Sequence, residues 1–494
     1  MKTLLINPFS LASRSWMPYP PHEPLALEYL AAVAPNGVRI FDCRGEFPYE
    51  YKALPNGMFH VGASLEQIRT FITSWKPELV GITSPFTTQI PSVYSIVNLI
   101  KEIDKDIITV IGGCTPSCYP IQTLKENQNI DIIVVGEGEL TFRELLDNEG
   151  RNLDRVDGIA YRNGNQIIRN NPRHFIKNLD KIPFPRRDLV PFENYSRYKK
   201  YGKFKKCTSF LRTRGVKYVI KYVFDRGHQL LYAKDFLQRV PKYGIEAKIL
   251  TSRGCPFNCY FCAVHNVWRR TYRMRSAENV LEEMELLYEK YKVRHFGIVD
   301  DNFNISKKRT IEICKGIIER GLEVTLRADS GTYLSSIDEE TLSMMKRAGF
   351  HELYFGIESG NERILKDVIG KKINLEQVKE VARLCKGLGI VSGGYFMIGV
   401  PNETKETMEE TVKFALDSEL DRIRLYTCQP FPGSKLYEDC QERGWIAGDF
   451  HASKALIFES KSYVQTEDFS PEDVTRIATK GRAILRKHRR LDMR

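Results

Sequence analysis

Three cysteines occur within eight residues of one another in the stretch "SRGCPFNCYFCA" at residues 252–263. Cys255, Cys259 and Cys262 are separated by three and then by two residues. The chain has 11 cysteines and no signal-like leader, which favours reduced thiols and metal or redox chemistry over a disulfide framework. Three thiolates are one fewer than the four that close a structural zinc site or fully hold an iron–sulfur cluster.

Two kinds of metal site fit this spacing. A zinc ion could take His265 as its fourth ligand, at Cys-x-x-His spacing. Structural zinc sites favour a second Cys-x-x-Cys pair, however, and the sequence contains none. A [4Fe–4S] cluster needs only three cysteines if its fourth iron is left open to another ligand, so the cluster is the favoured interpretation.

The cysteines follow the first of six short apolar segments that alternate with helical patterns. These segments are 247–252, 294–301, 323–329, 352–359, 393–401 and 421–429. Repeated βα units predict an open or partial parallel barrel, whose chemistry takes place at the carboxyl ends of its strands. Polar side chains gather at those predicted ends: Asp300, Asp301, Arg327, Asp329, Glu358 and Ser359.

A second series of βα units occupies the N-terminal part of the chain. Its apolar runs are 3–7, 37–42, 79–84, 108–113 and 131–139. They predict a doubly wound parallel sheet of the Rossmann or flavodoxin-like kind. Glycines stand where these strands end, at Gly112, Gly113, Gly136 and Gly138. Glycine there lets the backbone approach a ligand closely, although each could also form only a tight turn.

The predicted fold class is therefore α/β, in four regions of the 494-residue chain. Residues 1–150 form the first α/β domain, and residues 151–245 hold a hairpin with an Asn163-Gly164 turn, a proline-rich linker and a basic aromatic insertion. Residues 246–430 form the partial (β/α)6 TIM-like barrel. Residues 431–494 form a C-terminal helical extension.

Composition and charge restrict the possible environment and partners. No apolar stretch is long enough to predict a transmembrane segment or a secretion signal, so we expect a cytoplasmic protein. The net charge is +12, and residues 195–224 contain no acidic residue. This basic segment could recruit a large or anionic substrate such as an acidic protein or peptide, or it could be a solvated insertion. A nucleic-acid partner is the less favoured interpretation.

The stretch "CPFNCYFC" resembles the Cys-x3-Cys-x2-Cys signature of the radical SAM superfamily. The later stretches "GIVDDNF", "GIESGNERIL" and "GYFMIGVPNETKETMEET" resemble its strand-end motifs, so the resemblance covers about residues 245–450. It implies that Cys255, Cys259 and Cys262 hold a [4Fe–4S] cluster whose fourth iron binds S-adenosylmethionine (SAM). It also implies a one-electron reductant, of the flavodoxin or ferredoxin type, whose electron cleaves SAM to a 5′-deoxyadenosyl radical.

The resemblance further implies a set of SAM contacts at the strand ends. By position these are Phe261 beside the adenine, Asp300 and Asp301 for the methionine amine, Arg327 for the methionine carboxylate, Glu358 or Ser359 for the ribose, and the backbone of Gly399, Val400 and Pro401 facing the adenine. Each charged residue in this set could instead be a helix cap or a salt-bridge partner.

The N-terminal region resembles the cobalamin-binding subgroup of the same superfamily. The motif that supplies a histidine to cobalt reads "DCRGEF" here, with Asp42 followed by Arg44 where the histidine would stand. The subgroup commonly lacks this histidine, so the resemblance implies base-off cobalamin without a histidine ligand from this loop. The further cobalamin contacts that it implies are Thr83, Ser84, Gly112, Gly113, Gly136, Glu137, Gly138 and Thr141.

The resemblance implies a class B radical SAM methyltransferase that methylates an unactivated carbon, with a protein or peptide among its candidate substrates. One SAM would methylate cob(I)alamin and a second would generate the radical that activates the substrate. The alternatives are a cyclase or rearrangement enzyme with the same cofactors, a first domain without a corrinoid, a cluster-holding structural or nucleic-acid-binding protein, and a methylthiotransferase. The last would use Cys43, Cys114 and Cys118 for a second cluster.

Overall fold

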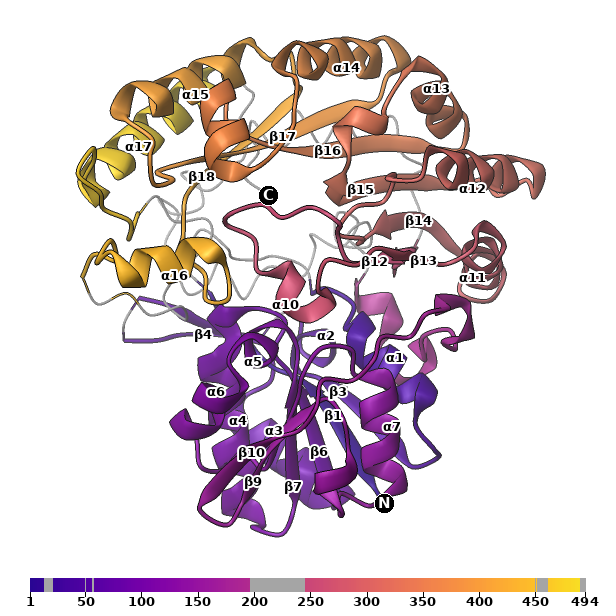
Figure 1. The fold of residues 1–494 in the computed structure, drawn as a ribbon. Coiled ribbons are helices and arrows are strands. Elements are labelled where there is room, and N and C mark those ends of the chain that lie inside the picture. The colour runs from indigo at the N-terminus through magenta and orange to yellow at the C-terminus, as the bar shows by residue number, and fades with distance from the viewer. Residues whose placement is uncertain are drawn as a thin grey trace, which may run out of the picture.

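The computed structural model describes residues 1–12, 21–48, 50–55, 57–195, 245–448, 450 and 461–488. Two α/β bodies lie one above the other, the first built from the N-terminal region and the second from the C-terminal half (Figure 1). The short helix α10, Val264–Trp268, lies where they meet. Apart from Tyr195, the predicted basic segment at 195–224 lies outside the described residues.

The first body is built on a seven-stranded sheet with the order β10-β9-β8-β7-β6-β1-β3. Its five parallel strands are β1 Thr3–Asn7, β3 Val38–Asp42, β6 Leu79–Thr83, β7 Ile108–Gly112 and β8 Ile132–Val134. Counted along the chain these five run in the order 2-1-3-4-5, which is the flavodoxin-like arrangement. The predicted doubly wound sheet is confirmed.

Helices cover both faces of this sheet because alternate side chains of each strand point to opposite sides. Leu5 of β1 joins a core with Leu27 and Phe142, from helices α1 Leu25–Val33 and α7 Glu139–Asp147. Its neighbours Leu4 and Ile6 join a second core with α3 Leu65–Trp75 and α4 Ile90–Ile103. The short helices α2 Cys43–Glu46, α5 Cys114–Cys118 and α6 Pro120–Glu126 follow β3 and β7.

The predicted hairpin belongs to this first sheet. Strands β9 Ile159–Asn163 and β10 Gln166–Arg169 add to β8 in antiparallel fashion, so the sheet continues past residue 150. The strand expected at 131–139 is shorter than expected: β8 stops at Val134, Gly136 has a positive φ of 81°, and α7 begins at Glu139. A small sheet that the sequence did not indicate joins β2 Ser10–Ala12, β5 Phe59–Val61 and β4 Tyr51–Ala53.

The second body contains six parallel strands that pair in chain order, which confirms the parallel arrangement of a partial barrel. Within the described residues its first and last strands do not pair with each other. The strands are β11 Ile245–Ile249, β14 Val293–Ile298, β15 Thr325–Thr332, β16 Phe350–Glu358, β17 Val391–Ile398 and β18 Arg422–Thr427.

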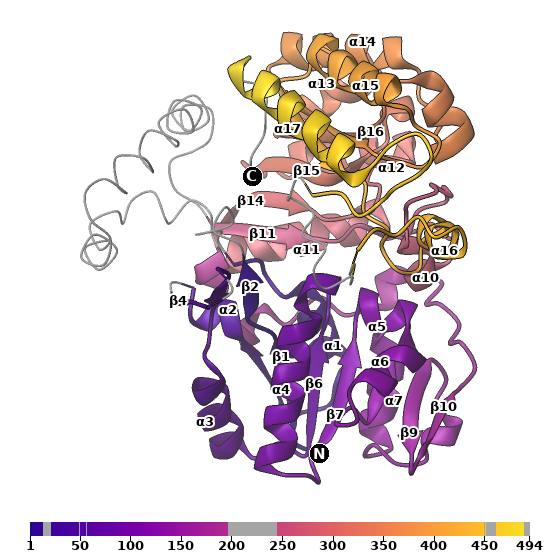
Figure 2. The same cartoon turned by 90° about the vertical axis from the view of Figure 1, so that its left-hand side faces the viewer.

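Helices cover the outer side of these strands (Figure 2). They are α11 Ala277–Lys290, α12 Lys307–Glu319, α13 Glu339–Arg347, α14 Leu375–Leu388 and α15 Lys405–Asp417. A Ser, Asp, Asn or Thr side chain caps the N-terminus of each, which satisfies free backbone N–H groups. Leu353, Phe355 and Ile357 of β16 lie in the core with the outer helices, so Glu352 and Glu358 face the inner side.

The C-terminal region forms the predicted helical extension. Helix α16, Lys435–Glu442, lies beside the junction of the two bodies, and α17, Pro471–Lys487, packs on α15 and β18. Arg482 of α17 donates a hydrogen bond of 2.9 Å from Nε to the carbonyl oxygen of Leu425. No helix in the described part of the chain is long and apolar enough to span a membrane.

Candidate cofactor sites at the domain junction

The cysteine loop runs from a two-stranded ribbon and returns to it. Strand β12, Ser252–Arg253, pairs antiparallel with β13, Arg273–Met274, and the three cysteines and α10 lie between them. The loop begins with Gly254 at a φ of +82°, where a Cβ atom would lie 2.2 Å from the Thr271 carbonyl oxygen. Only glycine permits this close approach, so the loop start is fixed by the backbone itself.

The middle of the loop is attached to the barrel through Tyr260. Its backbone N–H donates to the Ile369 carbonyl over 3.0 Å, and its own carbonyl accepts from the Leu436 N–H over 3.1 Å. Its hydroxyl donates to Asp439 over 3.0 Å. Phe261, the predicted adenine neighbour, is partly buried against the barrel core. The loop is therefore held from the segment after β16 and from α16.

The three cysteines are half-buried. Burial raises the pKa of Cys255 and brings that of Cys259 to about 11 and that of Cys262 to about 12. Asn302 donates a hydrogen bond of 3.1 Å from its Nδ2 to the Cys255 sulfur. The cationic Lys371 lies close enough to lower the pKa of Cys255 and Cys259, which favours the thiolates that iron requires.

Within the described ranges, no three His, Cys, Asp or Glu side chains converge on a position for one metal ion. The zinc alternative with His265 therefore has no support among those residues. An iron–sulfur cubane places each cysteine on a different iron, so it does not need three ligands around a single point. Three separate thiols, an amide donor and a nearby lysine fit such a cluster.

Lys371 is a site residue that sequence reasoning missed. Its Nζ donates to Glu358 Oε1 over 2.8 Å and also to the Gly356 carbonyl. Glu358 has a φ of +76°, a backbone conformation that residues other than glycine rarely adopt and that often marks functional sites. In sequence Lys371 stands in "GKKINL" and looks like an exposed turn residue. Only the fold brings it to the cysteines.

The two adjacent candidates for the SAM amine, Asp300 and Asp301, have different surroundings in the structure. Asp300 is fully buried and accepts hydrogen bonds from the Thr251 backbone at 2.6 Å and from the hydroxyls of Thr251 at 2.5 Å and Ser252 at 2.6 Å. Asp301 lies beside the cysteine loop, where it accepts from the Gly254 N–H over 3.1 Å and where burial raises its pKa to about 6. Asp301 therefore has more capacity left for a ligand than Asp300.

The same contrast holds at the end of β16. Ser359 is fully buried and shares a hydrogen bond of 3.0 Å with Thr411 of α15. It therefore lies on the helix side, whereas Glu358 lies on the inner side with Lys371. Arg327 is likewise engaged, because its buried guanidinium is paired with both Glu246 and Asp329.

The predicted adenine-facing turn, Gly399, Val400 and Pro401, is organised by Glu403. The Oε2 atom of this buried glutamate accepts from the Gly399 N–H over 2.7 Å and from the Val400 N–H over 2.8 Å. Its Oε1 atom is buried and has no hydrogen-bond partner among the residues that the structure describes. Burial raises the pKa of Glu403 to about 8. Sequence reasoning missed this residue, although a carboxylate two positions after a proline turn was a usable signal.

The predicted cobalamin residues lie at the carboxyl edge of the first sheet. Gly113 has a φ of +123°, and a Cβ atom there would lie 2.4 Å from the Ser84 carbonyl oxygen. A Cβ on Gly112 would meet nothing closer than 3.8 Å. Thr83 lies at the end of β6, and the Ser84 N–H donates to the Gly112 carbonyl over 2.7 Å. Gly113 thus holds two strand ends together, whereas Gly112 leaves open space.

Among the described residues, four buried side-chain oxygens without a hydrogen-bond partner follow this edge in the chain. They are Ser84 Oγ, Gln89 Oε1, Ser92 Oγ and Thr115 Oγ1. All lie on the segments that follow β6 and β7. Buried polar atoms are normally hydrogen-bonded, so a group of unpartnered neutral oxygens fits a ligand that carries many amide groups. The residues present therefore fit cobalamin.

The third segment of this edge, residues 136–141, comprises the loop after β8 and the start of α7 and is largely engaged with protein. The Gly136 N–H donates to Ser117 Oγ over 3.0 Å, and Gly138 packs against Leu30. Thr141 donates to the Asp157 carbonyl over 3.2 Å and accepts from Arg173 over 2.7 Å. Glu137 forms ion pairs of 2.8 Å with Arg253 and with Arg273.

The motif that has Arg44 in place of the cobalt-binding histidine is held by contacts within the protein. Asp42 is fully buried and accepts hydrogen bonds from Asn7 at 2.8 Å, from the Arg44 backbone at 3.0 Å and from the Tyr195 hydroxyl at 2.7 Å. Tyr195 also covers Gly45, where a Cβ atom would lie 2.3 Å from the tyrosine oxygen. Sequence reasoning did not find the contact between Tyr195 and Asp42, since more than 150 residues separate them.

The three cysteines of the methylthiotransferase alternative are not assembled. Cys114 and Cys118 form a hydrogen-bonded pair, and the Cys118 thiol lowers the pKa of Cys114. Cys43 is buried beside Asp42, at the start of α2 after β3.

The cysteine loop meets the first body directly. Helix α10 packs on α5, and a Cβ on Gly136 would lie 3.5 Å from the carbonyl oxygen of Val267 in α10. The Cys118 sulfur lies 2.9 Å from the Cβ position of Gly433, which precedes α16. The two candidate sites therefore face the same junction.

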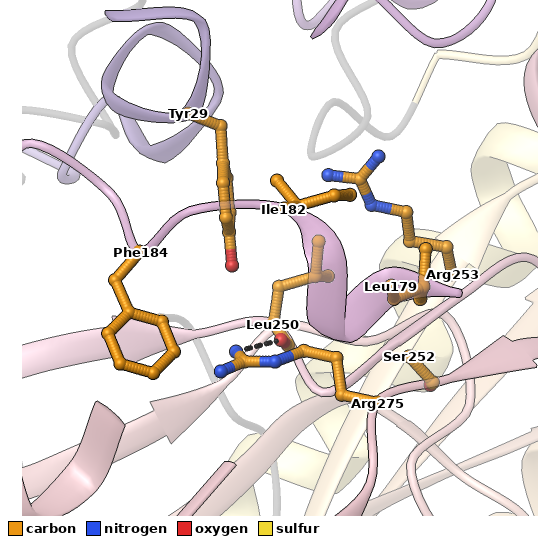
Figure 3. A pocket seen from close by; sticks show the side chains of 8 residues that line it. All are labelled: Tyr29, Leu179, Ile182, Phe184, Leu250, Ser252, Arg253 and Arg275. Carbon is orange, nitrogen blue, oxygen red and sulfur yellow. Dashed lines mark hydrogen bonds between the residues drawn. The ribbon is translucent and has the colours of Figure 1, made fainter. Parts of the chain in front are cut away.

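A small pocket lies behind the base of the cysteine loop (Figure 3). There Arg275 donates from Nη1 to the Leu250 carbonyl over 2.9 Å. The lining contains none of the three cysteines and none of the glycines at the first sheet's edge, so this pocket is not the candidate cofactor site. It is lined by Tyr29, Leu179, Ile182, Phe184, Leu250, Ser252, Arg253 and Arg275.

Comparison with known proteins supports these assignments of fold and family. Residues 249–415 match the Radical SAM superfamily and residues 18–146 match the B12 binding domain. An uncharacterized methyltransferase of Pyrococcus horikoshii, PH0819, is 31% identical over 89% of this chain and 83% of its own. An anaerobic magnesium-protoporphyrin IX monomethyl ester cyclase of Rubrivivax gelatinosus is 30% identical over 77% of this chain and 61% of its own.

The fold is also that of a solved enzyme. The radical SAM methyltransferase TsrM of Kitasatospora setae, solved with cobalamin and a [4Fe–4S] cluster bound, superposes with a TM-score of 0.64. It is 18% identical and the match covers 90% of this chain and 79% of that one. The chain therefore belongs to the radical SAM superfamily, in the group with a B12-binding domain, and its cofactors are a [4Fe–4S] cluster, SAM and cobalamin.

Proposed function

We propose that the protein transfers a methyl group to an unactivated carbon of its substrate. The observation that carries this proposal is the junction itself, where α10 of the cysteine loop packs against the glycine loops of the first sheet. When bound, the cluster and SAM supply a carbon-centred radical, and cobalamin supplies the methyl group. Both would then act on one substrate between the two bodies, out of reach of bulk water.

The residues of the cysteine loop have separate tasks in this proposal. Cys255, Cys259 and Cys262 hold the cluster, and the Asn302 amide orients the Cys255 sulfur. Lys371 offsets the negative charge of the thiolates and keeps Glu358 on the inner face, where that carboxylate accepts from a SAM hydroxyl. Asp301 accepts from the SAM amine, and its position is fixed by the Gly254 N–H.

The first sheet holds cobalamin through space and neutral hydrogen bonds. Gly112 leaves room for the ligand, and the unpartnered hydroxyls of Ser84 and Thr115 hydrogen-bond its polar groups. Asp42 is occupied by Tyr195, and Arg44 stands where a cobalt-binding histidine would be. We therefore expect the bound cobalamin to lack a histidine ligand from residues 42–45. Electron paramagnetic resonance (EPR) of the cob(II)alamin form tests this, because an imidazole nitrogen splitting would contradict it.

A second candidate function is oxidative cyclisation. It is favoured by the 30% identity to the cyclase of Rubrivivax gelatinosus, which acts on a tetrapyrrole by its name. The experiment that separates the two is anaerobic reconstitution with cobalamin, a chemical reductant and SAM carrying a deuterated methyl group. A methyltransferase places the label in a product detected by mass spectrometry, whereas a cyclase releases 5′-deoxyadenosine and leaves the product unlabelled. Cys259→Ala is the inactive control.

For the substrate we propose a protein or peptide, recruited by the basic segment at residues 195–224. This segment carries no acidic residue, although beyond Tyr195 it lies outside the described residues. Long-range attraction acts on encounter and weakens with salt. The variant with Lys199, Lys200, Lys205 and Lys206 changed to Glu should raise the KM for substrate at low salt and leave substrate-free SAM cleavage unchanged. A flavodoxin or ferredoxin is the proposed electron donor.

A further inference from the structure

Two arginines stand opposite each other at the base of the cysteine loop. Arg253 of β12 pairs directly with Arg273 of β13 in the ribbon that opens and closes the loop. Like charges at directly opposite positions of paired strands repel each other. Both guanidinium groups are also removed from water, with 4% and 11% of the side chain exposed. The ribbon is therefore stable only if other groups neutralise these charges.

The neutralising groups come from the other body. Arg253 donates to Glu137 Oε1 over 2.8 Å and also to Glu139, and Arg273 donates to the two carboxylate oxygens of Glu137 over 2.8 and 2.9 Å. Glu137 lies in the loop after β8 and Glu139 is the first residue of α7, and both are almost fully buried. The two positive and two negative charges balance only while the bodies are docked.

Aromatic rings cover this charge cluster and connect it to the loop. The guanidinium carbons of Arg253 and Arg273 lie 5.5 and 5.9 Å from the ring of Trp268, the last residue of α10. Phe175 covers Arg273 at 4.5 Å, and Tyr29 covers Arg253 at 5.5 Å. Cation–π contacts of this kind are stronger in the absence of water. The whole loop from Gly254 to Tyr272 is thus held at its base.

We propose that Arg253, Arg273, Glu137 and Glu139 form an ion clamp that sets the distance and orientation between the cluster and cobalamin. The clamp joins the two cofactor loops at their ends, since Arg253 precedes Cys255 by two residues and Glu137 directly follows Gly136. Its members are positioning residues and touch no reacting atom. The inference rests on the proposed function, because that function requires both cofactors to act on one substrate.

A second buried ion cluster provides a matched control. Arg187 also joins the two bodies, with hydrogen bonds of 2.6 Å to Glu23, 2.8 Å to Glu283 and 2.7 Å to the Lys248 carbonyl. It has the same chemistry and comparable burial, but it contacts neither the cysteine loop nor the loop after β8. When each cluster loses one pair, Glu137 keeps Arg273 and Glu283 keeps Arg275, and Glu28 loses its 4.0 Å contact with Arg187.

The first test uses hydrogen–deuterium exchange of the cofactor-free protein. The Arg253→Gln/Glu139→Gln variant should exchange at least about tenfold faster than the parent in residues 254–272 and 136–146, because the loops open locally. The Arg187→Gln/Glu23→Gln control should leave those peptides at the parental rate. Equal exchange in the clamp variant and the parent, or an equal rise in the control, overturns the proposal. This readout is independent of catalysis, so it distinguishes failure of the clamp from failure of the proposed function.

The second test measures the geometry of the reconstituted protein. Pulsed EPR between the reduced cluster and cob(II)alamin should give one narrow distance distribution in the parent and control, and a broad one in the clamp variant. Cluster absorbance and substrate-free 5′-deoxyadenosine release should stay within about twofold of the parent, since the cysteines are intact. If the double variant does not fold, Arg253→Lys decides, because lysine keeps the charge but cannot bridge both carboxylates. An unchanged distribution in Arg253→Lys then refutes the clamp.

Discussion

The parallel strands of both large sheets end at the same junction, but the carboxyl edges of the two sheets differ in chemistry. The barrel edge presents ionisable groups, among them Asp301, Glu358, Lys371 and Glu403. The edge of the first sheet presents glycines and buried neutral oxygens without partners, such as Ser84 Oγ and those of Gln89, Ser92 and Thr115. Each edge matches the ligand expected there.

The difference reflects what each cofactor requires. SAM carries an amine, a carboxylate and a sulfonium, and the cluster requires thiolates, so the barrel edge must hold charge in a partly buried place. Buried charge is costly unless it is paired, which is why Lys371 contacts Glu358 and Asp301 accepts a backbone N–H. Cobalamin is large and rich in amides, so the first sheet needs space and neutral hydrogen-bonding groups more than charge.

The largest expected effect tests the charged edge. Cys255→Ala, Cys259→Ala and Cys262→Ala should each abolish the [4Fe–4S] absorbance and 5′-deoxyadenosine formation, because each thiolate binds one iron. Cobalamin binding to the first sheet should persist, which would show that the two edges work separately. Cys314→Ala, in α12, is the control and should retain the cluster. Parental SAM cleavage by Cys259→Ala would contradict the cluster assignment.

The next effect separates the two glycines of the neutral edge. Gly113→Ala should lower the free energy of unfolding by more than about 3 kcal/mol, because its Cβ would meet the Ser84 carbonyl and its φ is positive. Gly112→Val should leave stability nearly unchanged and weaken cobalamin binding by filling open space. Urea unfolding and equilibrium binding of cobalamin measure the two effects. Tight cobalamin binding by Gly112→Val would remove this residue from the site.

The third effect concerns pH and the buried carboxyl at the barrel edge. The pKa of Glu403 rises from 4.5 to about 8 on folding, so the folded state holds a proton that the unfolded state releases between these values. Stability should therefore fall as pH rises through this window, by at most about 1.4 kcal/mol for each pH unit. Glu403→Gln resembles the protonated form and should remove this contribution. Urea unfolding at about pH 5.5 and about pH 8.5, two values that span most of this window, should show a smaller difference in stability for the variant than for the parent.

The smallest effect compares a partnerless hydroxyl with a partnered one. Ser84→Ala should leave the stability of the cofactor-free protein unchanged, because Ser84 Oγ has no hydrogen bond to lose. It should weaken cobalamin binding by about five- to tenfold, the value of one hydrogen bond. Ser117→Ala loses bonds to Gly113 and Gly136 and should cost about 1 kcal/mol of stability even without cobalamin. Calorimetry and binding titration distinguish the two variants.

The sequence alone was enough for the features that depend on local spacing. The cysteine spacing, the apolar strand runs and the glycines at strand ends are each contained in about ten residues, and the structure has strands at ten of the eleven predicted runs within three residues of their expected ends. Strand β8 is the exception, because Gly136 turns the chain before the apolar run is complete. Local backbone preferences and side-chain period therefore determined the fold class.

Only the tertiary structure decided which polar groups meet. Asp300 and Asp301 are adjacent and chemically equivalent in sequence, yet one is consumed by Thr251 and Ser252 and the other faces the cysteine loop. Lys371 gave no motif strong enough to be recognised, and the pairing of Arg253 with Glu137 crosses 116 residues. The physical reason is that a buried charge is stabilised by whatever partner the packing of distant elements brings to it, and residue spacing carries no record of that partner.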